Sequence, residues 1–418
     1  MSTTSSLEVL RRSGVDATKA SDRARIPFRT TNPTPSTTLP PFWFVNVTWG
    51  ENHTGLFLDV ALPTQLSQCN LPAFENDRDA VYKIFTTRKD AERIRRSSSF
   101  AKLQAIITTE IIEIDLTAPG GSHTILTNCH KAVIREAAKT NAAIVFLAPD
   151  IVVADGSFAN LRQLVAEGKK AVMLAGVRLD KESFVPTFLK ACRPQEEAVA
   201  SVRPRDLVGL AIDHLHPISR SLEWPPKSNW PSHLYWRVAD EGFLARCYHL
   251  HPILVVAGEG QVDFSSTIDG DYVLNAYPQD QVYVVDDSDE VLLFEISPHC
   301  YLMGDRPDPI FENKVGLWAG RHANRLHRRM FERTLSFHQG GQAAAWERER
   351  HSVEQIAARI QNRTRLWDIL APLITLAVFV LRPPVRFCRR VIRFARSRCG
   401  GIRRRMIAAI RGGNTGVK

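Results

Sequence analysis

The stretch that decides the fold is Ala142–Leu161, AAIVFLAPDIVVADGSFANL. Its apolar run Ile144–Leu147 is short and rich in β-favouring side chains, which predicts a strand buried on both faces. Asp150 stands where that strand stops, and the Asp-Gly-Ser triplet at 155–157 predicts a turn followed by a helix cap. Ligands of open α/β sheets bind at the carboxyl ends of the strands, so Asp150 is a candidate metal or substrate ligand. The alternative is an acid that only caps the loop.

Strands alternate with helices on both sides of this stretch. Strands are expected at 42–48, 79–86 and 171–177, and helices at 128–140 and 158–167. This alternation predicts a mainly parallel, doubly wound α/β sheet with flanking helices. Further helices are expected over 56–68, 89–97 (charged), within 182–210 (two helices) and over 313–361 (a run of helices). Further strands are expected over 242–256, 281–285 and 290–295, and a mixed segment over 100–114 ends like a strand. Loops are expected over 49–55 and, of irregular form, over 224–236.

The composition is that of a globular protein, and its charge is concentrated at one end. The 418 residues are 44% hydrophobic and 23% charged, which allows a large core in two to three units. The net charge is +10, but residues 382–418 hold eleven Arg, Lys418 and no acid, which leaves −2 for the rest. The seven cysteines are scattered without zinc spacing, which favours reduced thiols in a cytosolic compartment. Residues 1–41 lack a signal-peptide apolar region and predict a disordered leader.

The order of elements over 42–298 resembles that of nucleotide-sugar-dependent glycosyltransferases of the GT-A fold, and most of all the family 2 enzymes. The resemblance is carried by the helix NCHKAVIREAAKTNAA at 128–143, the strand AIVFLAPD at 143–150 and the helix after DGSF. In that class the strand ends in an Asp-x-Asp motif whose carboxylates hold a divalent metal on the sugar diphosphate. A hard cation neutralises the charge that the leaving diphosphate gains, so the resemblance implies Mn²⁺ or Mg²⁺ as a cofactor.

The chain departs from the motif of that class. The triplet at 148–150 is Ala-Pro-Asp, which keeps only the last carboxylate. Asp155 is a candidate second metal ligand, and substrate oxygens with water are the alternative. Some metal-dependent GT-A enzymes carry a late histidine that completes the metal sphere, and this resemblance makes His299 a further candidate.

A second acidic cluster, TIDGD at 267–271, occupies the position of the later acidic pair of family 2 enzymes. One carboxylate acts there as the general base on the attacking hydroxyl, which makes Asp269 and Asp271 candidates for that role. The alternative interpretation is ordinary helix N-cap chemistry before Tyr272.

Histidines supply further candidates. His249 and His251 stand two residues apart in an expected strand, so both side chains are predicted on one face, where they could bind a metal, an acceptor or phosphate oxygens. A pair of partly buried polar side chains is the alternative. His130, at the start of an expected helix, could approach a diphosphate at the helix N-terminus, and a helix N-cap environment with no ligand is the alternative.

Two loops after expected strands are candidates for donor binding. Trp49 could stack on the nucleotide base, and Glu51 or Asn52 could bond the ribose. Thr87 and Arg88 follow the second strand in a comparable position. Ordinary surface loops are the alternative in both places.

The C-terminal segment suggests a membrane surface. Residues 366–381 are mostly apolar, but they include Asp368 and Pro372 and fall short of the ~20 residues that a spanning helix needs. The following stretch mixes apolar residues with Arg in a helical rhythm, which predicts attachment to an anionic membrane. A spanning run would place the body away from cytosolic nucleotide-sugars, so a peripheral or monotopic attachment at the cytoplasmic face is favoured. The alternative is a helix pair packed on the body, and no specific nucleic acid is expected because no binding module is recognised.

These observations predict a membrane-associated glycosyltransferase that moves a sugar from a nucleotide-sugar donor to a glycan, lipid or protein hydroxyl, as in bacterial cell-surface glycan synthesis. The alternative is a non-catalytic GT-A-like protein that binds a ligand or scaffolds a membrane complex. The expected organisation is a leader over 1–41, a GT-A-like catalytic domain over 42–300, a helical extension over 301–365 and a membrane-associating tail over 366–418.

Overall fold

A computed structural model describes residues 39–373, apart from 118–120, 194–196, 259–263, 265–266, 269–270, 302–305, 342 and 372. The chain divides into a unit over Met1–Leu39 and a unit over Pro40–Lys418, and the features below belong to the second. Most of the expected leader and of the expected tail lies outside the described residues.

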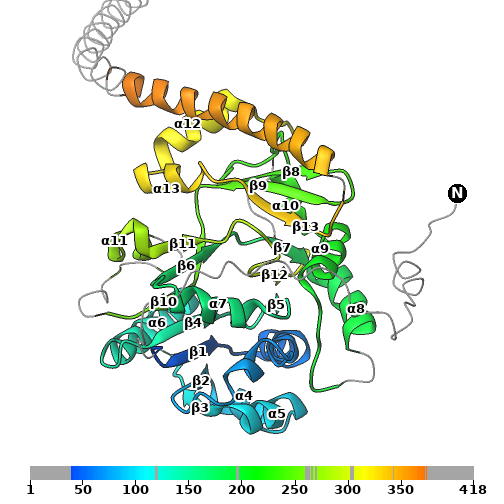
Figure 1. The fold of residues 1–418 in the computed structure, drawn as a ribbon, viewed down its shortest axis with the longest axis vertical. Helices are drawn as coiled ribbons and strands as arrows, with labels where there is room; N and C mark the ends of the chain where they lie inside the picture. Colours follow the sequence, from blue (N-terminus) through cyan, green and yellow to red (C-terminus); the bar gives the residue numbers. More distant parts are fainter. Residues whose placement is uncertain are drawn as a thin grey trace, which may run out of the picture. The chain divides into compact units, whose positions relative to one another are not determined.

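A seven-stranded sheet forms the centre of the fold (Figure 1). Its order is β11-β6-β10-β4-β1-β2-β3, and only β10 runs antiparallel to its neighbours. The predicted mainly parallel α/β architecture is therefore confirmed. The strands are β1 (Phe42–Val47), β2 (Val81–Thr86), β3 (Thr108–Glu113), β4 (Ala143–Leu147), β6 (Ala171–Leu174), β10 (His251–Val256) and β11 (Val282–Val284).

Local sequence explains why the central strands and their helices form. Every residue of β1 and of β4 is buried, as the continuous apolar runs predict. Thr87 and Ser97 cap the next helices because their side-chain oxygens accept backbone N–H groups of the first turn. The helices around this sheet are α2 (Glu51–Leu56), a π-helical turn (Phe57–Ala61), α3 (Leu62–Gln65), α4 (Arg88–Arg95), α5 (Ser98–Ile106), α6 (Gly121–Ala138) and α7 (Ser157–Ala166), with a 3₁₀ turn at Leu71–Phe74.

Two three-stranded sheets complete the strand arrangement. One has the order β5-β12-β7, and the other has the order β13-β9-β8. Their strands are β5 (Ile151–Val153), β7 (Arg178–Asp180), β8 (His233–Val238), β9 (Gly242–Cys247), β12 (Leu293–Ser297) and β13 (Leu335–His338). The later helices are α8 (Lys181–Cys192), α9 (Pro204–Asp213), α10 (Pro217–Ser221), α11 (Tyr272–Ala276), α12 (Glu312–His322), α13 (Arg325–Met330) and a helix over 343–371, with a 3₁₀ turn at Gln279–Gln281.

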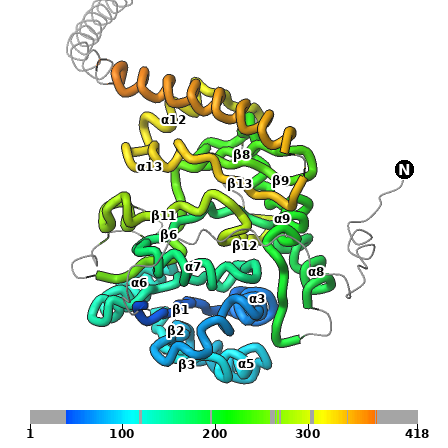
Figure 2. Tube along the Cα trace, in the orientation of Figure 1, coloured from blue at the N-terminus to red at the C-terminus, as the bar shows by residue number. Residues whose placement is uncertain are grey.

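The C-terminal helices build a hydrophobic core of their own. In Figure 2 the yellow and orange segments, which hold α12, α13 and the helix over 343–371, lie beside β8 and β9. Trp236, Leu244 and Tyr248 pack there against Trp318 and Ile360. The predicted helical extension is therefore an integral layer on the β13-β9-β8 sheet.

Four expected elements were wrong in kind. The loop expected over 49–55 already begins helix α2, and the irregular loop expected over 224–236 ends in strand β8. The single strand expected over 242–256 is two strands, β9 and β10, in different sheets. The helical run over 313–361 is interrupted by β13, which adds an edge to β9. In the last three cases the partners that decide the outcome are distant in the sequence, so tertiary pairing outweighs local pattern.

The structure describes the expected apolar segment only up to residue 373. In the part of the chain that is described, no helix combines the length and the apolar character that crossing a membrane requires.

Candidate functional site

Several polar side chains gather where the parallel strands end. The antiparallel strand β10 begins at this edge, because His251 pairs with Leu174 at the carboxyl end of β6. Gly176 then approaches His251 so closely that an added Cβ would lie 2.7 Å from the imidazole. A larger residue at position 176 would displace the imidazole, which lies at the edge where α/β sheets bind ligands.

Asp150 lies at the same edge, three residues after β4 and only partly exposed. Burial raises the pKa of this carboxyl group, while the neighbouring charges of His53 and Arg178 act to lower it. His53 belongs to α2, so the helix after β1 also reaches the carboxylate. Asp150 is thus a desolvated acid beside a histidine and an arginine from two other elements.

Arg178, the first residue of β7, is held in place by several partners. Its Nη1 lies 2.5 Å from Oε1 of Glu295 and donates to Oγ of Ser297 at 2.8 Å. Its guanidinium also lies over the ring of Tyr301, 5.1 Å from the centroid. An arginine that is fixed in this way presents its remaining donors in a defined direction, which suits phosphate oxygens.

Four histidines form what we call the histidine cluster: His233, His249, His251 and His327. The rings of His233 and His251 are 6.4 Å apart, and those of His249 and His327 are 4.3 Å apart. Burial lowers the pKa of His233 to about 3 and that of His249 to about 4. Burial also lowers the pKa of His327. These three imidazoles are therefore neutral at pH 7 and keep a free nitrogen lone pair.

Asp271, the residue before α11, contacts the histidine cluster. Its Oδ1 lies 2.7 Å from Nε2 of His327, and both carboxylate oxygens accept from Nδ2 of Asn324 at 3.2 and 3.3 Å. Among the described residues, the buried Nδ1 of His327 and the buried Nε2 of His249 have no hydrogen-bond partner. The carboxylate therefore orients an imidazole whose other nitrogen is available.

The electrostatic couplings join these groups into one row. Arg178 influences the pKa of both Asp150 and His233, and His233 is coupled to His249 and His251. The pKa of His249 responds in turn to His327 and Asp271. Two of the four acids that the sequence singled out, Asp150 and Asp271, thus stand at the two ends of this row. We call this row, from Asp150 to Asp271, the edge site.

The predicted strand geometry of the histidine pair was wrong. His249 lies in the turn between β9 and β10, and only His251 belongs to a strand. The pair still meets the edge site, because β10 starts there. His130 also differs from the expectation, since α6 begins at Gly121 and His130 lies within the helix, buried with its ring 5.1 Å from that of Phe146. A diphosphate at a helix N-terminus is therefore not available to His130.

Other predicted residues have partners elsewhere. The Oδ1 of Asp155 accepts from the backbone N of Cys69 at 2.8 Å, and the Nδ1 of His299 pairs with Asp180. The backbone N of His299 also donates to Glu182 at 2.8 Å. None of these three contacts involves Asp150. Asp269 lies outside the described residues.

The two predicted donor loops meet through Asp90. Its Oδ2 accepts from Oγ1 of Thr87 at 2.7 Å and from the backbone N of Gly50 at 3.0 Å. The loops after β1 and β2 are therefore tied together beside the start of α2. The predicted donor residues sit on these loops: Trp49 partly buried against the core, Glu51 exposed at the start of α2, and Arg88 exposed at the start of α4.

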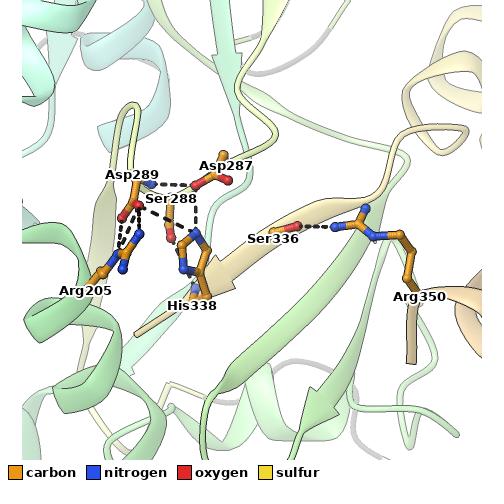
Figure 3. A network of polar contacts seen from close by, with 7 residues as sticks. All are labelled: Arg205, Asp287, Ser288, Asp289, Ser336, His338 and Arg350. Atoms are coloured by element: carbon orange, nitrogen blue, oxygen red, sulfur yellow. Dashed lines mark hydrogen bonds and ion pairs between the residues drawn. The ribbon is translucent and has the colours of Figure 1, made fainter. Parts of the chain in front are cut away.

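A second acidic group follows β11 (Figure 3). Asp287, Asp289 and His338 each offer one ligand atom, and these atoms lie within 4.8 Å of one another. Nε2 of His338 lies 2.9 Å from Asp287 and 3.9 Å from Asp289. Arg205 holds Asp289 through Nη2 at 2.7 Å and Nε at 3.0 Å. Two carboxylates and one imidazole are ligand types that suit a divalent cation such as Mn²⁺.

The charges of this second group are already balanced. The hydrogen bond to Asp287 raises the pKa of His338. Burial is the strongest single influence on Asp287 and would raise its pKa. The hydrogen bonds from His338 and from the backbone N of Asp289, together with the charges of His338 and Arg205, outweigh burial, so the pKa is lowered. A bound cation would therefore compete with Arg205 and with the proton of His338.

Several of these residues were not predicted from the sequence. The Asp287-Ser288-Asp289 triplet is itself an Asp-x-Asp sequence directly after a strand, and this signal could have been found. Arg178, His233 and His327 carry no local signal, because only the fold brings them to the edge site.

No protein-family model matches the chain, and no curated protein sequence matches it. Solved structures do match. One is a mannosyltransferase from Pyrobaculum calidifontis in complex with GDP-Man and Mn²⁺, with 13% identity, a TM-score of 0.29, and coverage of 84% of this chain and 83% of that one. Another is a protein from Bacillus anthracis described as a glucose-1-phosphate thymidylyltransferase, in complex with sucrose, with 12% identity and a TM-score of 0.22. The match to the latter covers 33% of this chain and 55% of that one, and likeness at these levels concerns the fold alone.

Proposed function

We propose that this chain is a glycosyltransferase that moves a sugar from a nucleotide-sugar donor to a hydroxyl of a glycan, a lipid or a protein. One observation carries the proposal. Asp150 and Asp271 lie 121 residues apart in the chain. Asp271 contacts His327, whose ring lies 4.3 Å from that of His249. Arg178, whose charge acts on Asp150 and on His233, links this histidine cluster to Asp150 at the carboxyl edge of the sheet. One arginine and several imidazoles between two acids offer hydrogen-bond donors to a diphosphate, which suits a substrate with a diphosphate in its middle and reacting groups beside it.

The proposed roles follow from the contacts. Arg178 and His251 would bond the diphosphate oxygens, and the joined loops at Thr87 and Gly50 would face the nucleoside. Asp271, held by His327 and Asn324, would accept the proton of the attacking hydroxyl. The bond between the sugar carbon and the diphosphate oxygen breaks as the hydroxyl oxygen bonds to that carbon, and the nucleoside diphosphate leaves.

A divalent cation would neutralise the charge on the leaving diphosphate. Two acidic places are candidates to hold it. Asp150 offers one carboxylate in the edge site, while the Asp287, Asp289 and His338 group offers three ligand atoms. Asp150 alone would need oxygens from the substrate and water to complete the sphere.

The proposal is tested by titration calorimetry and a hydrolysis assay with a panel of nucleoside-diphosphate sugars, with and without Mn²⁺. We expect one donor to bind, and Asp150→Asn to lower turnover roughly a hundredfold or more with an unchanged melting temperature. Asp287→Asn in the same titration shows whether the second acidic group contributes to the Mn²⁺ dependence.

The matched control is Asp206→Asn, which removes the same charge from an exposed pair with Arg203 on α9. Its turnover should stay within about twofold of the parent. Unchanged turnover in Asp150→Asn would remove Asp150 from the mechanism, and a chain that binds no donor of the panel would favour the scaffold alternative.

A further inference from the structure

The helix over 343–371 presents two apolar faces in succession. In its first half Val353, Ile356, Ala357 and Ile360 are buried in the core that it shares with α12 and β9. These residues follow one another at spacings of three, one and three, which places them on one side of a helix. This side faces the body of the protein.

In its second half, and at Leu373 just after it, the apolar residues face solvent. Leu366, Ile369, Leu370 and Leu373 are 47%, 64%, 44% and 56% exposed. Their spacing is again that of one helical side. At 3.6 residues per turn, their common direction lies roughly 140° around the axis from that of the buried side. We call these four residues the exposed stripe.

The rotation of the helix is fixed by contacts on its other side. Nη1 of Arg328, in α13, lies 2.5 Å from Oδ2 of Asp368. A Cβ added to Gly320, in α12, would lie 3.2 Å from the Cβ of Trp367. Because these contacts hold the inner side against α12 and α13, the helix cannot turn the exposed stripe inward without breaking them.

The sequence after the exposed stripe indicates what covers it. Residues 374–381, ITLAVFVL, contain no charge, and residues 382–418 carry twelve positive charges and no acid. A second copy of this chain would cover the apolar stripe but would bring its own twelve positive charges to the contact. A nucleic acid would match the charges but not the apolar side chains. An anionic lipid bilayer matches both.

We propose that the exposed stripe is a docking surface for an anionic lipid bilayer, on which this end of the helix lies in the plane of the interface. The four side chains would enter the boundary between head groups and acyl chains. The arginines that follow would bind the anionic head groups. This proposal does not depend on the chemistry of the edge site.

The test is cosedimentation of the full chain with vesicles of phosphatidylcholine alone and of phosphatidylcholine with phosphatidylglycerol. We expect binding to the anionic vesicles and little to the neutral ones. The double substitution Ile369→Glu and Leu373→Glu should weaken binding at least about tenfold, because two apolar side chains no longer enter the interface. The circular dichroism and melting temperature of the double variant should match the parent, since both positions are exposed.

The matched control is Asn362→Glu, which adds a negative charge on the same exposed side of the same helix, before the stripe begins. It should change binding less than about twofold at physiological salt. Unchanged vesicle binding by the double variant would overturn the proposal. So would a dimer of the parent chain that the double variant dissociates, because a second copy would then be the occupant. Equal binding of both vesicle types would also overturn it.

Discussion

At the scale of single residues, the protein treats buried charges in two ways. Lys83 is almost fully buried on β2, but its Nζ lies 2.6 Å from Glu110 and 3.3 Å from Glu136 and sits over the ring of Trp43. Its charge is therefore paired, as a buried charge must be. The histidine cluster differs from Lys83, because burial lowers the pKa of His249 and its side chain stays uncharged at neutral pH.

The neutral state of His249 predicts a pH dependence of stability. Its pKa is about 4 in the folded protein against an ordinary value of 6.5, so the unfolded chain takes up the proton first. The stabilising contribution is thus complete above about pH 6.5 and is lost as the pH falls toward 4. His249→Gln should reduce this loss by on the order of 2 kcal/mol, measured as the free energy of unfolding in urea at several pH values.

His123→Gln is the control for this experiment, because His123 is exposed on α6. It should leave the pH dependence as in the parent. If both variants keep the parental slope between pH 6.5 and 4, burial of His249 is not the cause of that slope.

At the scale of elements, the pairing of β9 with β13 links two features. One is the hydrophobic core under the C-terminal helices, and the other is the Asp287, Asp289 and His338 group. Gly242 opens β9 with φ +152°, and an added Cβ would lie 2.0 Å from the carbonyl oxygen of Phe337. Gly242 pairs with His338, the histidine that holds Asp287. The geometry of the Asp287, Asp289 and His338 group therefore depends on a glycine in a different strand.

Gly242→Ala should lower the free energy of unfolding by more than about 2 kcal/mol, because the methyl group collides with backbone atoms that cannot move freely. Gly168→Ala is the control: it also has a positive φ, but nothing lies within 4 Å of its added Cβ. Its cost should be about 1 kcal/mol, from backbone strain alone. Equal losses in the two variants, measured by urea unfolding, would show that the close approach at Gly242 is not the cause.

At the scale of the whole molecule, two hydrophobic cores share the strand β9. Phe243, Ala245 and Cys247 belong to the core of the central sheet, while Leu244 belongs to the core under the C-terminal helices. Alternate residues of one strand thus serve opposite faces. The C-terminal helix is consequently part of the folded body and not an appendage.

This sharing predicts different effects for two truncations. A chain that stops after Leu373 keeps Val353, Ile356 and Ile360 and should unfold in one cooperative transition at a melting temperature near that of the full chain. A chain that stops after Gly340 leaves Trp318 and Tyr248 uncovered, so it should melt at least about 10 °C lower or aggregate. Calorimetry and binding of a hydrophobic dye measure both effects. Equal melting temperatures would show that the helix adds nothing to the second core.

The sequence by itself determined the alternation of strands and helices, the burial of β1 and β4, and the place of Asp150 at the end of β4. These features depend on side-chain periodicity and apolar runs within a few residues, which a single segment contains in full. The resemblance to GT-A glycosyltransferases added the second acidic position, where Asp271 contacts His327 and Asn324.

Only the tertiary structure decided which residues meet there. Arg178 reaches Asp150 because β7 and β5 both pair with β12, and His327 reaches Asp271 from 56 positions further along the chain. The antiparallel direction of β10 brings His251 to the carboxyl edge, and the pairing of β13 with β9 brings His338 to Asp287. Strand direction and the packing of distant elements depend on partners that no local stretch encodes, and for this reason Arg178, His233 and His327 had to be found in the fold.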